Sequence, residues 1–466
     1  MSSLEERIAK LEALVERQQA TIEQQRHDIA ARDAVIERLQ ARITELERGG
    51  MPGGKPPPTP PSRSGGEPSG RKRGGQPGHK GHRRDLLPPE KVTRTVECFP
   101  ENCRGCGDAL PKVVDANPVR SQLLELPEVK PDVTEFRKHR VACHCGVVTC
   151  GLPPRGTPAG LMGPRLLAFV GLLVANCHVS RRKMQALLSD VLNVDISLGA
   201  LSESEAIVSD AVATPVEEAR AHAMAAEVKH ADGTTWYRAH IFKALWVMAT
   251  KAVTVFTIFE AGTIEALTAW MGEKGVLVSD RGSQLSFWAM KRRQICWAHL
   301  IRKFAWYAEQ RGEAGQIGLG LLGLARFLMH EWHRARDGCI TRETFARNTI
   351  ATRDTIEVLL RRGTHVPAIA GSCAHILKHR DALWRFVSLP GVEPTNNHAE
   401  QELRAFVLWR KTSLGSQSVR GDRFATNLKS VIHTCRKQKR HVLSFLTEAI
   451  QAAFSKRSAP SLLPNP

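Results

Sequence analysis

The 466-residue sequence lacks the long apolar segment that a membrane-spanning helix requires. A span needs roughly 18 or more consecutive apolar residues, and the apolar run 166–175 is too short and is typical of a buried helix. The N-terminus also lacks the apolar core of a signal peptide. We therefore expect a soluble, cytoplasmic protein without a membrane partner.

The chain is also short of acidic residues, with 47 Asp and Glu against 66 Lys and Arg, a formal net charge of +19. Such an excess attracts a polyanion over long range, and DNA or RNA is the usual one. An anionic membrane surface is the rival partner, but no apolar run supports it. We expect association with the nucleoid, and a chain of this length predicts several domains.

The chain has 11 cysteines, and six of them cluster in the segment 91–158. Disulfides are rare in a cytosolic protein. Cys103-x-x-Cys106-Gly and Cys143-His-Cys145-Gly are two pairs of thiolates, which suit a tetrahedral structural Zn²⁺. We predict a zinc-binding module over 91–158 with these four ligands. The second pair has an unusual spacer, so other ligands stay open: Cys98, His144 and Cys150.

A heptad repeat predicts a coiled coil over residues 1–48. β-Branched residues at every a position, with Leu at the outer d positions, favour a parallel two-stranded coil and hence a homodimer or higher assembly. The alternative is one amphipathic helix packed on its own protein. The a positions are Ile8, Val15, Ile22, Ile29, Ile36 and Ile43, and the d positions are Leu4, Leu11, Gln18, Gln25, Arg32, Leu39 and Leu46.

A basic linker rich in Pro, Gly and Ser follows at 49–90. This composition cannot bury a core. Arg71, Lys72 and Arg73 either bind DNA phosphates as part of an extended arm or belong to a solvated linker, and composition leaves both interpretations open.

Residues 159–225 form a predicted helical region for DNA binding or linkage. Ser180 and Ser197 have the character of helix N-caps. Two helices with a short turn between them are compatible with a helix-turn-helix, although ordinary helical packing is the preferred interpretation.

An α/β catalytic domain is predicted over 226–410. Strand-like runs rich in aromatic and β-branched residues occupy 242–250 and 252–259, and shorter ones occupy 275–279 and 293–296. Residues 300–392 are predominantly helical in pattern and form a predicted insertion. A basic C-terminal region, 411–466, completes the chain.

Three acidic residues carry the chemistry of this predicted domain. Asp232 stands just before strand-like runs, Asp280 ends the run G-V-L-V-S-D, and Glu400 stands near the start of a helix. Carboxylates from strand ends and a helix, brought together by a fold, can hold a pair of Mg²⁺ ions, which prefer oxygen ligands. Two-metal sites serve phosphoryl transfer, so the sequence predicts a nuclease-like site.

The chain resembles transposases of the insertion sequence 66 family over nearly its whole length. The order and spacing of several short motifs carry this resemblance. They are Asp232 with Trp236, V-S-D at 278–280, R-R-Q-I-C-W-A-H-L at 292–300, E-P-T-N-N-H-A-E at 393–400, L-W-R-K-T-S-L-G at 408–415 and T-C-R at 434–436.

The resemblance implies a multidomain α/β protein with a ribonuclease H-like core. It also implies a DDE transposase that hydrolyses phosphodiesters at the element ends and joins the 3′-OH to target DNA. Asp232, Asp280 and Glu400 would be catalytic residues that bind two Mg²⁺ or Mn²⁺ ions. Accessory proteins of the same element are implied partners. The predicted DNA-binding residues of this region are Arg404, Arg410 and Lys411.

Two features qualify this interpretation. The family usually has Glu after the first Asp, whereas this chain has Gly233. The alternative function is therefore a catalytically impaired DNA-binding or assembly protein derived from such a transposase. In addition, Cys296-x-x-His299 resembles half a zinc site, but no second pair is near in sequence. We interpret both residues as structural, beside the active site.

Overall fold

The computed structural model describes residues 18–19, 22–23, 37, 85–158 and 160–464. The predicted coiled coil, and Arg71, Lys72 and Arg73 of the predicted linker, lie outside the described residues, apart from five isolated positions of the coil. The chain divides into two compact units, residues 1–125 and 126–466. No helix in the described part of the chain is both long and apolar enough to cross a membrane.

The described part of the first unit contains the 3-10 helix η1 (Pro89–Lys91) and a tight turn that a β-bridge between Asn102 and Ala109 closes. The Gln122 side chain exchanges hydrogen bonds of 2.8 and 2.9 Å with the Leu87 backbone. The second unit holds both hydrophobic cores of the described residues.

The second unit begins with a short antiparallel hairpin and a group of helices. The N-caps predicted at Ser180 and Ser197 are confirmed, because each hydroxyl accepts a hydrogen bond from the backbone N–H three residues later. The elements are β1 (Arg140–Ala142), β2 (Val148–Cys150), α2 (Pro164–Cys177), α3 (Arg181–Leu192), α4 (Leu198–Ala211) and α5 (Ala213–Ala225).

A mixed five-stranded sheet forms the centre of the second unit, in the order β5-β4-β3-β6-β7. The strands β3, β4 and β5 form an antiparallel meander, whereas β6 and β7 run parallel to β3. The elements are β3 (Val228–Arg238), β4 (Ile241–Ala249), β5 (Thr254–Phe259), α6 (Ile264–Met271), β6 (Val276–Ser279), η2 (Ser283–Leu285), η3 (Met290–Arg292) and β7 (Arg293–Ile295).

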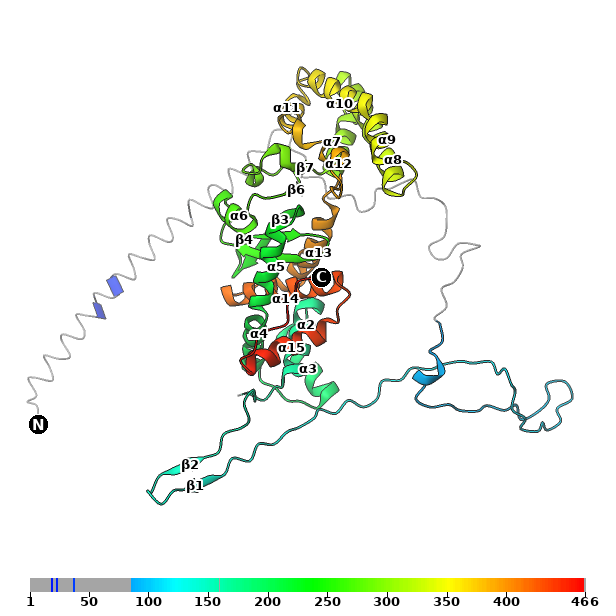
Figure 1. The fold of residues 1–466 in the computed structure, drawn as a ribbon, viewed down its shortest axis with the longest axis vertical. Coiled ribbons are helices and arrows are strands. Elements are labelled where there is room, and N and C mark those ends of the chain that lie inside the picture. Colours follow the sequence, from blue (N-terminus) through cyan, green and yellow to red (C-terminus); the bar gives the residue numbers. More distant parts are fainter. Residues whose placement is uncertain (1–17, 20–21, 24–36, 38–84, 159, 465–466) are drawn as a thin grey trace, which may run out of the picture. The chain divides into compact units, whose positions relative to one another are not determined.

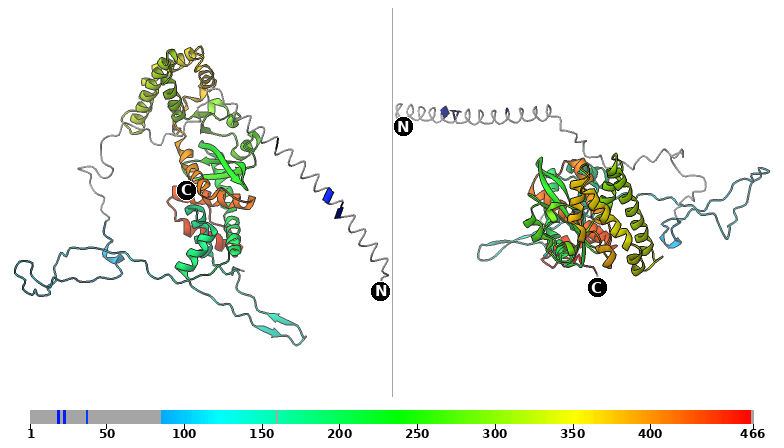
Figure 2. Two further views of the ribbon diagram at one scale, coloured as in Figure 1. Left: turned by 180° about the vertical axis from the view of Figure 1, so that it is seen from behind. Right: turned by 90° about the horizontal axis from the view of Figure 1, so that it is seen from above.

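The elements that follow β7 are all helices, as the sequence predicts for residues 300–392. In Figures 1 and 2 the helices α7 to α12 gather beyond one end of the sheet, while α2, α3 and α15 lie beyond the other. The elements are α7 (Trp297–Ala308), α8 (Glu313–Arg336), α9 (Arg342–Asn348), α10 (Ile350–Gly363), α11 (Ala370–Lys378), η4 (Arg380–Ala382), α12 (Arg385–Ser388), α13 (Asn397–Ser413), α14 (Val419–Lys437) and α15 (Val442–Phe454).

An aromatic cluster fixes α13 against the sheet. The ring of Trp236 on β3 meets those of Phe406 and Trp409 on α13 at centroid distances of 5.4 and 5.9 Å. All three side chains are buried, and edge-to-face aromatic pairs stabilise beyond the area that they bury. The middle of α13 is therefore packed directly against β3.

Candidate active site

The predicted acidic residues Asp232 and Asp280 lie on neighbouring parallel strands. The register pairs His230 of β3 with Val278 of β6, so Asp280 stands level with Asp232, two residues beyond the last paired position. Asp280 directly follows β6, as predicted, whereas Asp232 lies inside β3 and not at a strand end. The sheet alone therefore sets the two residues side by side on neighbouring strands.

Glu400 completes the group from the first turn of α13. Burial raises the pKa of Asp232 to about 7, and the negative charges of Asp280 and Glu400 add to that rise, against the hydrogen bond from the Gly233 N–H. The charges of Asp280 and Glu400 therefore both act on Asp232. The excess negative charge and the oxygen donors fit one or two hard divalent cations.

The raised pKa of Asp232 predicts that the metal-free protein loses stability as the pH rises. The unfolded carboxyl ionises near 3.8 and the folded one near 7, so the folded state binds more protons between these values and the free energy of unfolding falls there. The loss is about 2 kcal/mol by pH 8, after allowance for partial exposure. Thermal unfolding in EDTA should show it.

The matched variant for this pH dependence is Asp232→Asn, which cannot ionise. Its melting temperature should fall less than that of the wild type between pH 4 and pH 8. Mg²⁺ should raise the wild-type melting temperature more at pH 8 than at pH 5. Equal pH profiles for the two proteins would contradict the electrostatic description of the site.

A buried arginine holds the loop that carries Asp280. The Arg293 guanidinium donates to the Asp280 carbonyl at 2.8 Å, to the Ser279 hydroxyl at 3.0 Å and to the Leu285 carbonyl at 3.0 Å. The Gly282 N–H in turn donates to the Asp280 carboxylate at 2.9 Å. The sequence interpretation missed Arg293 as a site residue, although it lies in the R-R-Q-I-C-W-A-H-L motif.

The start of α13 is tied to β3 and to the start of α7. The Asn396 amide donates to the Ala231 carbonyl at 2.8 Å, and the Asn396 backbone N–H donates to the Cys296 sulfur at 3.1 Å. Asn396 occupies the N-cap position, but its side chain makes no capping bond; the amide nitrogen binds the strand, and the side-chain oxygen is buried without a hydrogen-bond partner. Its role is to hold Glu400 beside Asp232.

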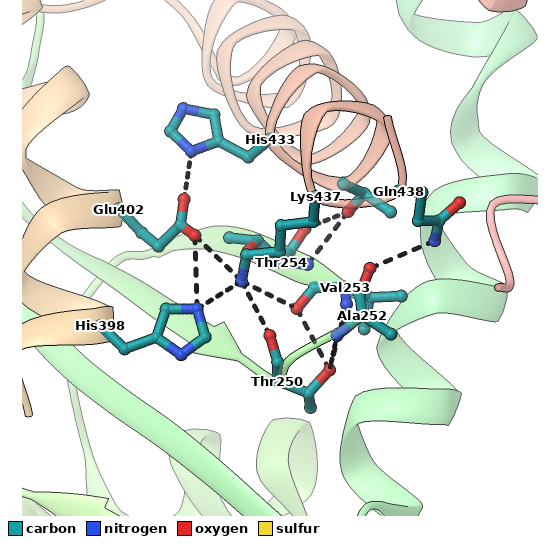
Figure 3. A network of polar contacts seen from close by, with 10 residues as sticks. Thr250, Ala252, Val253, Thr254, His398, Glu402, His433, Lys437 and Gln438 are labelled. Carbon is teal, nitrogen blue, oxygen red and sulfur yellow. Dashed lines mark hydrogen bonds and ion pairs between the residues drawn. The ribbon is translucent and has the colours of Figure 1, made fainter. Parts of the chain in front are cut away.

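A second carboxylate of α13, Glu402, anchors the helix to α14 (Figure 3). Glu402 is bonded to the His433 ring and lies 2.9 Å from the Lys437 ammonium, which also donates to the Thr250 carbonyl at 2.8 Å. Burial alone would raise the pKa of Glu402, but hydrogen bonds from His398 and His433 and the charge of Lys437 lower it far below its usual range. Glu402 is thus a partly buried, charged tether two residues from Glu400.

Replacing this tether by the neutral isostere, Glu402→Gln, should destabilise the protein by about 2 kcal/mol. The change keeps the shape but removes the charge that compensates Lys437, and hydrogen bonds to charged groups contribute about 1.5–3 kcal/mol. Chemical denaturation measures the loss. The control Glu448→Gln, at an exposed position of α15, should leave the free energy of unfolding unchanged, and equal stabilities for both variants would contradict the tether.

The predicted DNA-binding residues of α13 differ in their surroundings. Arg404 and Lys411 are exposed. Arg410 donates to the carbonyl and hydroxyl oxygens of Thr235 on β3 and contacts the Thr234 hydroxyl at 3.4 Å. Arg410 thus has an intramolecular role in joining the helix to the strand.

The two predicted zinc pairs form similar turns in different units. In the first, the Gly107 N–H donates to the Cys103 carbonyl, and in the second the Gly146 N–H donates to the Cys143 carbonyl, both at 2.9 Å. The backbone N–H groups of Cys106 and Cys145 lower the pKa of the Cys103 and Cys143 thiols, respectively. A lowered pKa favours the thiolate that binds zinc, while the joining of both pairs into one site stays a prediction.

Comparison with known proteins identifies the family of the chain. The sequence model described as "Transposase IS66 family" matches residues 159–423, which is more than half of the chain and includes Asp232, Asp280 and Glu400. No curated protein matches the chain. The extent of the family match establishes that this chain belongs to the IS66 family of transposases.

Proposed function

We propose that this chain is a metal-dependent DDE transposase whose catalytic carboxylates are Asp232, Asp280 and Glu400. The observation that carries the proposal is the strand register, which sets Asp280 level with Asp232, together with the charge of Glu400, which acts on Asp232 from the first turn of α13. Family membership implies a DNA substrate and the use of divalent metal ions.

We assign a ribonuclease H-like core to the central sheet. Its support is the mixed topology, in which a three-stranded antiparallel meander continues into two strands parallel to the first. The first acid lies on the central strand β3, the second follows the adjacent strand β6, and the third lies on a helix that packs on β3.

In the proposed reaction, a phosphodiester at the element end is hydrolysed and the freed 3′-OH then attacks target DNA. Asp232, Asp280 and Glu400 would hold two Mg²⁺ or Mn²⁺ ions, which when bound lower the pKa of water and neutralise phosphate charge. The Gly282 N–H orients the Asp280 carboxylate. Asn396 ties the start of α13, which carries Glu400, to β3 through the Ala231 carbonyl.

Basic residues near the three acids would bind phosphates of the DNA backbone. Arg281 directly follows Asp280, and its guanidinium lies 3.3 Å from the His375 ring of α11. Lys303 on α7 lies near enough to Arg281 that the charge of Arg281 lowers its pKa, in addition to the effect of burial. Cations in such proximity repel one another, and a phosphate between them would relieve the repulsion. The sequence interpretation did not include these residues among the DNA contacts.

The remaining modules would assemble the complex. We propose that the coil at 1–48 makes a dimer, that Cys103, Cys106, Cys143 and Cys145 bind a structural Zn²⁺, and that Arg71, Lys72 and Arg73 contact DNA with Arg404 and Lys411. Accessory proteins of the same element would join this assembly.

The proposal is tested with purified protein and a duplex that carries the terminal repeat of its element. Strand cleavage that needs Mg²⁺ and leaves a 3′-OH is the expected result, followed by joining of that end to a second duplex. Specific binding of the duplex without cleavage in Mg²⁺ or Mn²⁺ would favour the alternative, a DNA-binding protein derived from a transposase.

A further inference from the structure

Three different ligand types meet at the start of α7, outside the pair of aspartates. The Cys296 sulfur, the His299 Nδ1 and a Glu400 oxygen all lie within 4.8 Å of one another. Glu400 Oε1 is 3.9 Å from the sulfur and 3.8 Å from the ring nitrogen. Tetrahedral zinc, with bonds of about 2.0–2.3 Å, separates neighbouring ligand atoms by roughly 3.3–3.7 Å. Small side-chain movements would therefore complete the geometry.

The local fold points both side chains at Glu400. Cys296 directly precedes α7 and His299 lies in its first turn, and a spacing of three places them on one face. Cys296 is fully buried. The His299 Nδ1 is buried and has no hydrogen-bond partner, which is costly for a polar atom and calls for an explanation. A cation at this position would supply the missing partner.

The donor set differs from that of the two aspartates. Sulfur and imidazole nitrogen select zinc-like transition metals, whereas Mg²⁺ requires oxygen ligands. Three protein ligands also leave one position of a tetrahedral ion open for water or phosphate. The sequence analysis set aside Cys296 and His299 as half a zinc site because it found no second pair nearby, whereas Glu400 lies 101 residues beyond His299, on another helix.

We propose that Cys296, His299 and Glu400 form a binding site for Zn²⁺ that shares Glu400 with the catalytic centre. Glu400 can then be a ligand of Zn²⁺ or of the catalytic pair of ions. Zn²⁺ inhibits DNA cleavage because Glu400 bound to Zn²⁺ is lost to the catalytic pair. The inhibition rests on the proposed function, whereas the binding does not. The two parts therefore have separate tests.

Binding is tested by titrating the full-length, reduced protein with Co²⁺, which replaces Zn²⁺ and shows thiolate-to-metal absorption. The proposed cysteine module also takes up Co²⁺, so the difference between variants is decisive. Cys296→Ser should lose about one equivalent of thiolate-bound Co²⁺, and His299→Ala should weaken the binding of the same equivalent. The control Cys339→Ser, at an exposed cysteine between α8 and α9, should titrate like the wild type.

Inhibition is tested by adding Zn²⁺ to Mg²⁺-dependent cleavage, with each variant normalised to its own activity without Zn²⁺. Half inhibition of Cys296→Ser should need roughly 10-fold more Zn²⁺ or more than that of the wild type, since loss of even a supporting group weakens metal binding about 10-fold. If no protein cleaves DNA with any divalent ion, the proposed function fails and the Co²⁺ titration still decides the site. Coinciding titrations of the wild type and Cys296→Ser would overturn the site.

Discussion

Asp280→Asn is expected to abolish strand cleavage and strand joining, with rates lowered roughly 10³-fold or more. The change removes a charge and one metal-binding oxygen where Asp280 stands level with Asp232. It preserves the shape, and the remaining amide oxygen can still accept the bond from the Gly282 N–H. The variant should therefore fold normally. Single-turnover cleavage of an element-end duplex measures the loss.

The control for this prediction is Asp354→Asn, at an exposed position of α10. It should cleave at the wild-type rate, and both variants should bind the element end with similar affinity. Cleavage by Asp280→Asn within about 10-fold of the wild type would contradict its role as a shared metal ligand.

Gly233→Glu, which introduces the residue that the family usually has, is expected to destabilise this chain by about 3 kcal/mol. A Cβ atom at Gly233 would lie 2.7 to 3.0 Å from ring atoms of Trp246, the residue paired with it on β4. The Trp246 ring is nearly buried and also packs over Gly262. The ring therefore has little freedom to move aside. Chemical denaturation measures the loss.

A matched control for this change is Gly323→Glu on α8, where an added Cβ would meet nothing within 4 Å. This variant should be as stable as the wild type or slightly more so, since glycine disfavours a helix. Unchanged stability of Gly233→Glu would show that Trp246 can move aside. In this chain the Trp246 ring occupies the space that a side chain at Gly233 would need.

The sequence predicted the elements whose signals are local. The serines before α3 and α4 were recognised as caps, and aromatic and β-branched runs located β4 and β5. The extent of β3 was missed, because Asp232 and Gly233 are poor strand formers in the middle of an 11-residue strand. Pairing with β4 along its length and with β6 at its start overrides that preference.

The sequence predicted which residues form the candidate site, but not how those residues lie relative to one another. Motif order selected the three acids as candidates, and the strand register places Asp280 level with Asp232. The ties that hold Glu400 join residues far apart in sequence, such as Asn396 to Ala231 and Glu402 to Lys437. Such contacts leave no periodic or compositional pattern, so a single sequence does not reveal them.

The most direct test of the central claim compares Asp232→Asn, Asp280→Asn and Glu400→Gln with the triple variant in single-turnover cleavage. Residues that act as one unit are non-additive, because the loss of one disables the others. Each single variant should therefore lose nearly as much activity as the triple variant. Independent losses that multiply, or an active Asp232→Asn, would contradict a single catalytic site built from the three carboxylates.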